Sequence, residues 1–251
     1  VFYGFITKFL GFKPDRHEGK ILGLAAHGDY QKVLPIVKKM ISYENGRLFG
    51  QIGNNFTAWS TGTIPEIEKE LEKHTREDIA AATQYWLEVL TLKYIEPFVK
   101  EHNIKRIVLA GGVFANVVLN QKLLELEDVE NIYVFPHMGD GGNALGGAII
   151  KAVEEGIDLD YPMEDAYLGP SYNSKEIEAV LNNYTNEIEY KNVSDAKMRL
   201  AAEFIHEGKI VGWFQGRMEY GPRALGTRSI LARATDASSS WFKPSFKTPS
   251  S

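Results

Sequence analysis

The chain has 251 residues, of which 44% are hydrophobic and 24% charged, a composition typical of globular proteins. Its length allows one large domain or two smaller ones. The formal net charge of −5 gives no support for a nucleic-acid-binding surface. Absence of cysteine excludes disulfides and thiolate metal sites and is compatible with a reducing compartment, so we expect a cytoplasmic location. No apolar run approaches the ~18 residues of a membrane span, so no membrane partner is expected.

The first part of the chain is predicted to be helical. Apolar residues at helical spacing predict a helix over 1–10, which Gly11 ends, and an amphipathic helix over 30–43. Between them lies a charged loop, whose cations suit either a solvated surface or a grip on a phosphate. These cations are Lys13, Arg16, His17 and Lys20. A hairpin or edge segment at 47–52, a polar loop over 54–65 and a short charged helix over 64–73 follow.

The strongest helix signal begins at Thr75. Thr75 to Asp78 matches the [ST]-x-x-[DE] capping box, in which the first side chain accepts a hydrogen bond from the backbone of the first turn. Apolar residues from Ile79 continue at helical spacing towards Pro97. We interpret this stripe as core packing rather than as a cofactor contact.

Two strand–turn–helix units occupy the stretch from 105 to 147. The β-branched and aromatic runs at 106–110 and 132–135 predict buried parallel strands. Each run ends in a glycine-rich turn that opens a helical pattern. These turns contain Gly111 and Gly112, and then Gly139, Asp140, Gly141 and Gly142.

The two glycine turns predict a site for a phosphorylated ligand. Glycine allows close backbone approach, and a helix N-terminus attracts anions. A carboxylate at such a site, here Asp140, suggests a bridging metal cation that relieves the repulsion. Two alternatives stay open. The glycines can serve the turns alone, and Asp140 can be a helix cap.

The remaining elements are predicted from composition and period. An acidic connector covers 156–170. We then expect an extended piece at 166–168, a helix that Ser174 caps and that runs through Val180, and a strand at 187–193. A helix over 195–207 ended by Gly208 and a buried strand over 209–214 are predicted to follow. Residues 237–251 contain no period and are predicted to be an unrelated or disordered tail.

An arginine-rich motif follows the last predicted strand, from Gln215 to Leu231. Arg217, Arg223 and Arg228 are interleaved with glycines there. The planar guanidinium fork suits phosphate and carboxylate oxygens, so three converging arginines would hold a polyanion. The alternative is an exposed turn with unrelated arginines.

Five stretches of the chain match a known family in the family's own order. The most specific is the last of them, the arginine motif. They are Leu10–Pro14, Glu18–Gly28, Leu109–Asn120, Phe135–Gly146 and Gly216–Leu231. On these residues the chain resembles the O-carbamoyltransferases of the nodulation-protein U and tobramycin-carbamoyltransferase type.

The resemblance implies an α/β fold with two domains. Residues 1–170 would be the second half of an actin/sugar-kinase-like (ASKHA) domain that binds nucleotide and metal. Residues 171–236 would be a connector and the beginning of a YrdC-like α/β domain. The resemblance also implies that carbamoyl phosphate and ATP give carbamoyl-adenylate in the second domain. A hydroxyl of a small-molecule acceptor then takes the carbamoyl group in the first domain, beside Fe²⁺ or another divalent cation such as Mg²⁺.

The same resemblance implies roles for individual residues. Lys20 would contact an anion and Asp140 would bind the metal. Gly111, Gly112, Asn116, Gly139 and Gly141 would line the nucleotide, and Arg217, Arg223 and Arg228 would form the adenylate-forming site.

Parts of the family pattern have no counterpart in this sequence. The first phosphate loop and a His-x-x-x-His metal pair are expected before Val1, and most of the second domain is expected beyond residue 236. We therefore expect the 251-residue chain to bind nucleotide weakly, to hold little iron and not to complete the transfer. Two alternatives remain: a sugar-kinase-type phosphotransferase and a non-catalytic nucleotide-binding fragment. The acceptor and the oligomeric state have no signature.

Overall fold

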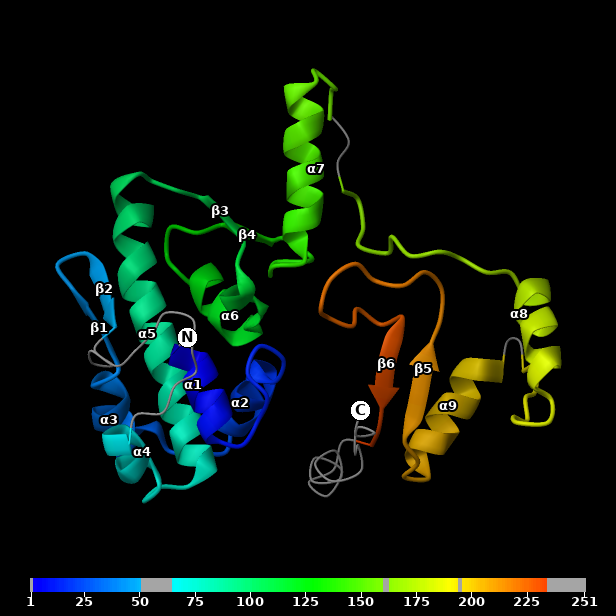
Figure 1. Cartoon of the computed structure of the whole chain (residues 1–251), viewed down its shortest axis with the longest axis horizontal. Helices are drawn as coiled ribbons and strands as arrows, with labels where there is room; N and C mark the ends of the chain where they lie inside the picture. Colours follow the sequence, from blue (N-terminus) through cyan, green and yellow to red (C-terminus); the bar gives the residue numbers. More distant parts are fainter. Residues whose placement is uncertain (1, 51–64, 160–162, 194–195, 234–251) are drawn as a thin grey trace. The chain divides into compact units, whose positions relative to one another are not determined.

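The computed structural model describes residues 2–50, 65–159, 163–193 and 196–233, and Figure 1 traces the whole chain. The structure is mixed α/β, as predicted, and its sheets are small. Two compact units are present, Val1–Asn143 and Ala144–Ser251, and each is described by itself. The domain boundary predicted near residue 170 stays a prediction. The predicted tail over 237–251 lies outside the described residues.

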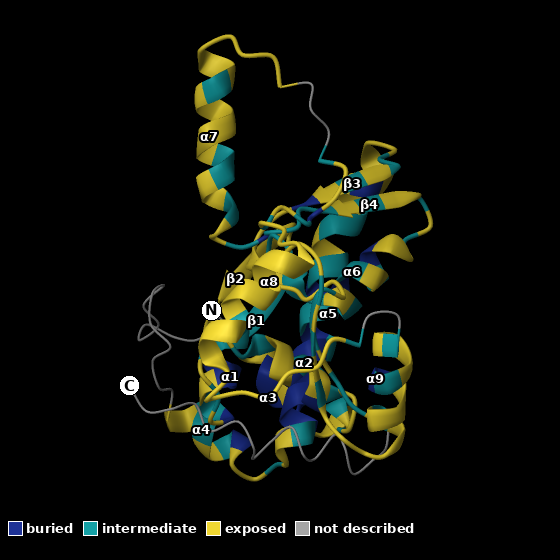
Figure 2. Cartoon of the chain, turned by 90° about the vertical axis from the view of Figure 1, so that its right-hand side faces the viewer, coloured by how far each residue is buried: buried dark blue, intermediate teal, exposed yellow. Residues whose placement is uncertain are grey.

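Helices that pack around one long central helix form the core of the first unit. The central helix is α5 (Arg76–Glu101), and α2 (Glu18–Ala25) makes the most extensive contact with it. The remaining helices are α1 (Phe2–Phe9), η1 (Tyr30–Lys32), α3 (Leu34–Lys38) and α4 (Pro65–Leu71). Their apolar faces bury a continuous core, which includes Phe5, Ile6, Ile21, Val37, Leu71 and Ile79. Buried residues mark the inward faces of these helices (Figure 2).

The predicted capping box of the central helix is confirmed in half: Thr75 caps the helix, but the Asp78 carboxylate bonds groups other than the backbone of Thr75. Thr75 has extended backbone angles, and its Oγ1 accepts a hydrogen bond from the backbone N–H of Asp78 at 3.1 Å. The Asp78 carboxylate in turn accepts from the backbone N–H of Asp29 at 2.7 Å and from Lys32 Nζ at 3.2 Å. The Asp29 N–H above all, and then Lys32, lower the pKa of the Asp78 carboxyl. The first turn of α5 is thereby fastened to η1.

Removal of this cap should destabilise the first unit. We expect Thr75→Ala to lower the free energy of unfolding by about 1 kcal/mol, because the N–H of Asp78 loses its acceptor. Urea unfolding followed by circular dichroism measures the difference. Thr75→Ser keeps the hydroxyl and should lie within about 0.5 kcal/mol of the parent chain. Equal losses for alanine and serine would show that the cap contributes little.

The predicted amphipathic helix over 30–43 is wrong as a single element. The segment forms η1 and α3 and then turns into a strand, β1 (Ile41–Glu44), which pairs antiparallel with β2 (Arg47–Gly50). Asn45 and Gly46 connect the two strands with positive φ angles of 49° and 79°. This pair is the favoured sequence for a two-residue hairpin turn, so the hairpin begins earlier than the predicted 47–52. The predicted charged loop is also shorter than expected, because α2 begins at Glu18 and contains Lys20.

The two parallel strands are confirmed, but not their complete burial. β3 (Arg106–Leu109) pairs with β4 (Asn131–Val134), with Ile107 opposite Ile132. Leu109 is buried, whereas Val108 is 73% exposed. Within the described residues the sheet has two strands, and alternate side chains therefore point away from the helices. The first glycine turn also continues as a 3₁₀ turn, η2 (Gly112–Ala115), before α6 (Val117–Leu124) begins.

The second unit contains three α-helices and one hairpin-like sheet in its described part. α7 (Gly142–Glu154) starts at the second glycine turn, as predicted, and leads into the unit. It is followed by α8 (Ser174–Leu181), η3 (Asn182–Tyr184), α9 (Lys197–His206), β5 (Val211–Phe214) and β6 (Arg228–Leu231). β5 and β6 pair antiparallel. Gly208, with a φ of 82°, ends α9 as predicted, and Lys209 N–H reaches Phe204 O at 2.9 Å.

Three predictions for this unit are corrected. Asn173, not Ser174, caps α8, because its side chain accepts from the N–H of Glu176 while the Glu176 carboxylate accepts from the N–H of Asn173. The strand predicted at 187–193 is absent, since the described segment has no paired strand there. The strand at 209–214 forms but is not buried, and Phe214 is 73% exposed. None of the helices in the described parts of the chain is long and apolar enough to cross a membrane.

Candidate functional site

The two glycine turns lie side by side at the carboxyl ends of β3 and β4. Leu109 O accepts from Phe135 N at 3.2 Å, so the strands stay paired up to the turns. Gly111 N then donates to Met138 O at 2.6 Å, which joins the first turn to the second. A Cβ on Gly139 would lie 3.9 Å from the Cα of Gly112. The structure therefore brings together the glycines that the sequence placed 27 or more positions apart.

Glycine is required at these turns for two different reasons. Gly111 has a φ of +114°, which side-chain-bearing residues rarely adopt. A Cβ on Gly141 would overlap the imidazole of His137, and one on Gly142 would overlap the carbonyl oxygen of His137. Gly112 differs, because no heavy atom of the described residues lies within 4 Å of the position of its Cβ. Open space beside Gly112 is what close approach of a ligand to the backbone requires.

Asn116 lies next to the first turn and is held by protein groups. Its Oδ1 accepts from Leu119 N at 3.1 Å and caps α6, and its Nδ2 donates to Gln84 Oε1 at 2.8 Å. Gln84 is 5% exposed and also accepts from the hydroxyl of Tyr3 at 2.9 Å. Burial, and then the nearby Glu88 and Glu18 carboxylates, raise the pKa of Tyr3. The side chain of Asn116 is therefore oriented by α5.

The sequence analysis missed Gln84. This residue sits among small residues in the buried part of α5, and a polar side chain in such a stripe needs a partner. That unexplained polar position was the signal in the sequence. Gln84 fixes the orientation of Asn116 and so links the long helix to the glycine turn.

Asp140 stands at the tip of the second turn and is exposed. The described residues contain no group of three His, Cys, Asp or Glu side chains that could hold a metal ion. Asp140 can supply one oxygen ligand, and Fe²⁺ or Mg²⁺ needs several. The residues described here thus do not form a complete metal site, and no step is derived through a metal.

Lys20 lies on a different element of the first unit, in the first turn of α2. Its Nζ is 5.4 Å from the ring centroid of Phe12, and the guanidinium carbon of Arg76 is 4.8 Å from the same centroid. Two cations thus share one aromatic ring, an arrangement that cation–π attraction stabilises. Lys20 is exposed and remains available to an anion.

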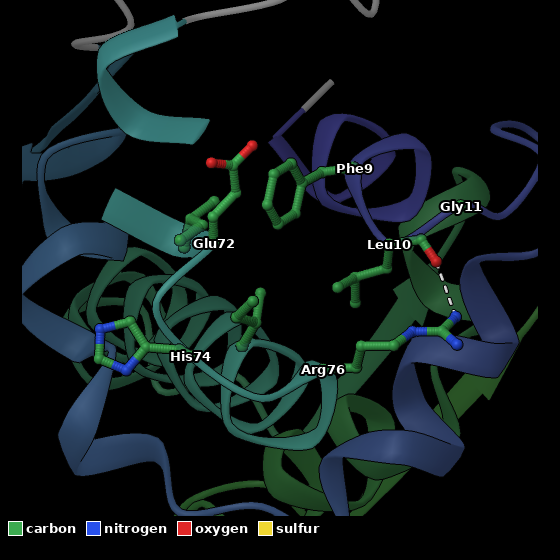
Figure 3. Close-up of a pocket in the computed structure, with 8 residues that line it drawn as sticks. Phe9, Leu10, Gly11, Glu72, His74 and Arg76 are labelled. Atoms are coloured by element: carbon green, nitrogen blue, oxygen red, sulfur yellow. Dashed lines mark hydrogen bonds between the residues drawn. The ribbon is translucent and has the colours of Figure 1, made fainter. Parts of the chain in front are cut away.

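A shallow hollow that is lined in part by Arg76 is not a better candidate for a ligand site than the glycine turns. It is lined by the end of α1, by the end of α4 with the connection that follows it, and by the start of α5, with Phe9, Leu10, Gly11, Leu71, Glu72, His74, Arg76 and Ile79. Figure 3 shows that the Arg76 guanidinium is turned to the carbonyl of Leu10, to which it donates at 2.7 Å. The polar groups of this hollow therefore do not converge on a common point, as a ligand site requires.

The arginine motif forms the connection between β5 and β6 in the second unit. Gln215 N donates to Thr227 O at 2.9 Å and closes the loop at its base. The predicted extended piece at 166–168 borders the loop: Tyr220 N donates to Ala166 O, and Gly169 N donates to Met218 O at 3.0 Å. A Cβ on Gly169 would lie 2.8 Å from Met218 N, so this contact needs glycine.

The three arginines of the loop have different surroundings. Arg217 is exposed, and its Nε donates to Gly169 O at 2.8 Å. Arg223 is exposed near the middle of the loop. Arg228 is half-buried, donates to three backbone carbonyls and stacks on Phe214 at 3.2 Å from the ring centroid. The three guanidinium groups therefore have different partners, and their convergence on one polyanion stays a prediction.

Glu219 is the loop residue that the sequence analysis overlooked. Its Oε1 accepts from the backbone N–H groups of Leu225, Thr227 and Arg228 at 3.0, 2.8 and 3.2 Å. The Thr227 hydroxyl, and then backbone N–H groups that include those of Leu225 and Thr227, lower the pKa of Glu219 to about 2. A carboxylate in an arginine-rich motif is easily taken for a counter-charge, and its backbone partners cannot be read from spacing.

Comparison with known proteins identifies the family. A family profile described as Carbamoyltransferase N-terminus matches residues 1–149, and one described as Carbamoyltransferase C-terminus matches residues 202–242. The first match covers more than half of the chain and contains both glycine turns. The second begins in α9 and contains the arginine loop.

Curated relatives support the same assignment. An uncharacterized protein of Methanocaldococcus jannaschii is 37% identical over 239 residues, which are 93% of this chain and 39% of the relative. Nodulation protein NolNO of Sinorhizobium fredii is 33% identical over 90% of this chain and 33% of its own length. Nodulation protein U of the same organism is 30% identical over 66% of this chain and 28% of its own length. The chain thus spans about two fifths or less of these three relatives, and it belongs to the carbamoyltransferase family.

Proposed function

We propose that the chain serves the transfer of a carbamoyl group from carbamoyl phosphate, through a carbamoyl-adenylate made with ATP, to a hydroxyl of a small-molecule acceptor. The observation that carries the proposal is the pair of glycine turns in contact, with open space beside Gly112. The family assignment supports carbamoyl transfer as the reaction class. In this proposal residues 1–170 are part of an ASKHA domain, and residues 171–236 are a connector and the beginning of a YrdC-like domain.

The glycine turns would bind the phosphates of a nucleotide. They lie at the carboxyl ends of two parallel strands, the edge at which open α/β sheets bind ligands. α7 starts at Gly142, directly after the second turn, and the positive end of its helix dipole favours an anion. Gly111, Gly112, Gly139 and Gly141 would allow the phosphates to approach the backbone. Asn116 would line this site from the start of α6.

The arginine loop would bind the anions from which the adenylate forms. Phosphoryl chemistry asks the protein mainly for positioned cations that stabilise charge on phosphate oxygens. Arg217 and Arg223 are exposed on the loop and would supply two such cations. In the first unit, Lys20 would contact an anion. Asp140 would be one ligand of Fe²⁺ or another divalent cation.

An assay with labelled carbamoyl phosphate tests the reaction class. The 251-residue chain is incubated with ATP, ¹⁴C-carbamoyl phosphate and a panel of hydroxyl compounds, and carbamoylated products are separated by chromatography. Formation of ¹⁴C-carbamoyl-adenylate, or of a carbamoylated acceptor, supports the proposal and would overturn the expectation that the 251-residue chain alone does not complete the transfer. Phosphorylation of a polyol without use of carbamoyl phosphate would instead indicate a sugar-kinase-type phosphotransferase. ATP binding without either product would indicate a nucleotide-binding segment.

Loss of the Arg223 guanidinium should weaken anion binding by the loop. We expect Arg223→Ala to cost about 1.5–3 kcal/mol of binding free energy for carbamoyl phosphate or ATP, because a charge-assisted contact is removed. Isothermal titration calorimetry measures the affinities. Arg199→Ala is the matched control, since Arg199 lies 77% exposed on α9 and pairs there with Glu203. Equal affinities for the parent chain and Arg223→Ala would show that Arg223 does not face the anion.

A further inference from the structure

The arginine loop has the composition of a mobile segment but an extensive set of internal hydrogen bonds. Gly216, Gly221 and Gly226 all have positive φ angles, which glycine adopts at little cost. Three such positions within the loop leave its path undetermined by backbone preference alone. Bonds from side chains to the backbone must therefore fix the path.

Glu219 provides the first set of these bonds. One oxygen of its carboxylate accepts from Leu225 N, Thr227 N and Arg228 N. These three N–H groups belong to the returning arm of the loop, whereas Glu219 belongs to the outgoing arm. Backbone N–H groups that converge in this way commonly bind an anion. Here the anion is built into the loop, so these N–H groups are already occupied.

Arg228 provides the complementary set. Its Nη1 donates to Gln215 O at 3.0 Å and to Thr227 O at 2.8 Å, and its Nη2 donates to Gly216 O at 3.2 Å. The guanidinium plane is also stacked on the Phe214 ring. The carbonyls of both arms thus share one cation at the base of the loop. Most of the donor capacity of Arg228 is used within the protein.

We propose that Glu219 and Arg228 are positioning residues, which clamp the two arms of the loop over 215–228 so that Arg217 and Arg223 present their guanidinium groups to an anionic ligand. Glu219, on the outgoing arm, holds N–H groups of the returning arm, and Arg228, on the returning arm, holds carbonyls of the outgoing arm. The role of the ligand rests on the proposed function above. The clamp itself does not, because it consists of bonds inside the loop.

Amide hydrogen exchange of the 251-residue chain tests the clamp without any ligand. In Glu219→Ala, the amides of Leu225, Thr227 and Arg228 should exchange at least about tenfold faster than in the parent chain, because they lose a charged acceptor. Amides of α9 should keep their rates. Glu219→Gln retains a carbonyl oxygen and should restore part of the protection. Glu203→Ala removes an exposed carboxylate of α9 and should leave the three amides unchanged.

A second variant keeps the test decisive where alanine at 219 impairs folding. Arg228→Lys keeps the positive charge but lacks the planar fork that reaches three carbonyls. It should accelerate the same amides and weaken the binding of ATP, measured by calorimetry, by about tenfold. Arg223→Gln should weaken ATP binding and leave the amide rates unchanged. This contrast separates positioning residues from a residue that contacts the ligand.

Three outcomes would overturn the inference. The clamp is refuted if the three amides exchange at the same rate with and without the Glu219 carboxylate. It is also refuted if these amides are unprotected in the parent chain. Faster exchange together with unchanged ATP affinity would refute the positioning role. If the parent chain binds neither ATP nor carbamoyl phosphate, the proposed function of the loop fails, and the exchange rates still decide whether Glu219 and Arg228 hold it.

Discussion

Gly28→Ala is expected to lower the free energy of unfolding of the first unit by about 3 kcal/mol or more. An alanine Cβ at this position would overlap the carbonyl group of Glu77 and lie 2.6 Å from the backbone nitrogen of Asp78. Both belong to the first turn of α5, which cannot shift on its own. Asp78 binds the N–H of Asp29 at 2.7 Å, and α2 packs along α5, so the strain would spread through the core.

The matched control is Gly23→Ala in α2. Gly23 is exposed, and no heavy atom of the described residues lies within 4 Å of its Cβ position. Alanine should stabilise this helix by about 0.5–1 kcal/mol, since glycine is unfavourable in a helix interior. Urea unfolding at 25 °C measures both variants. If Gly28→Ala is as stable as the parent chain, the backbone of Gly28 does not pack closely against α5, and this prediction is wrong.

Local signals in the sequence predicted the elements that local chemistry determines. Thr75 caps the long helix because its hydroxyl reaches the N–H of Asp78 within the same turn. Gly208 ends α9 because it alone adopts the left-handed conformation there without cost. The parallel strands were predicted from two short β-branched runs with helices after them. In each case the decisive contact lies within a few residues in sequence.

Predictions failed where the structure of a segment depends on a competing local signal or on a contact with residues distant in sequence. The spacing of apolar residues over 30–43 suits a helix, but Asn45 and Gly46 favour a hairpin turn. The end of that segment therefore forms the first strand of the hairpin. The strand predicted at 187–193 has a suitable composition, yet no described strand pairs with it. A strand needs a partner that its own sequence does not specify.

The same distinction holds for the candidate site. Sequence spacing selected the glycine turns, and the structure places them in contact. Spacing could not show that Arg228 turns to backbone carbonyls while Arg223 remains exposed, because both occur in the same glycine-rich motif. It could not show Gln84 beside Asn116 either, since 32 positions separate the two residues. Orientation of side chains across such distances is a property of the fold.

Gly112→Val should abolish nucleotide binding while the first unit stays folded. Gly112 does not have a positive φ, and the space around its Cβ position is open, so a side chain can begin there without strain or a clash of its Cβ. The change in the free energy of unfolding should therefore stay below about 1 kcal/mol. In the proposed function this open space receives the phosphates, and a β-branched side chain would fill it. We expect the affinity for ATP to fall about 100-fold, which corresponds to about 2.7 kcal/mol.

Two control variants separate binding from folding in this experiment. Gly23→Val introduces the same side chain into open space on α2, away from the turns, and should leave ATP affinity unchanged. Gly111→Ala should destabilise the unit, because alanine is strained at a φ of +114°. Circular dichroism and urea unfolding report folding, and equilibrium dialysis with labelled ATP reports binding. Unchanged affinity in folded Gly112→Val would mean that ATP does not approach this turn, whereas unfolding of that variant would assign Gly112 to the structure of the turn rather than to its ligand.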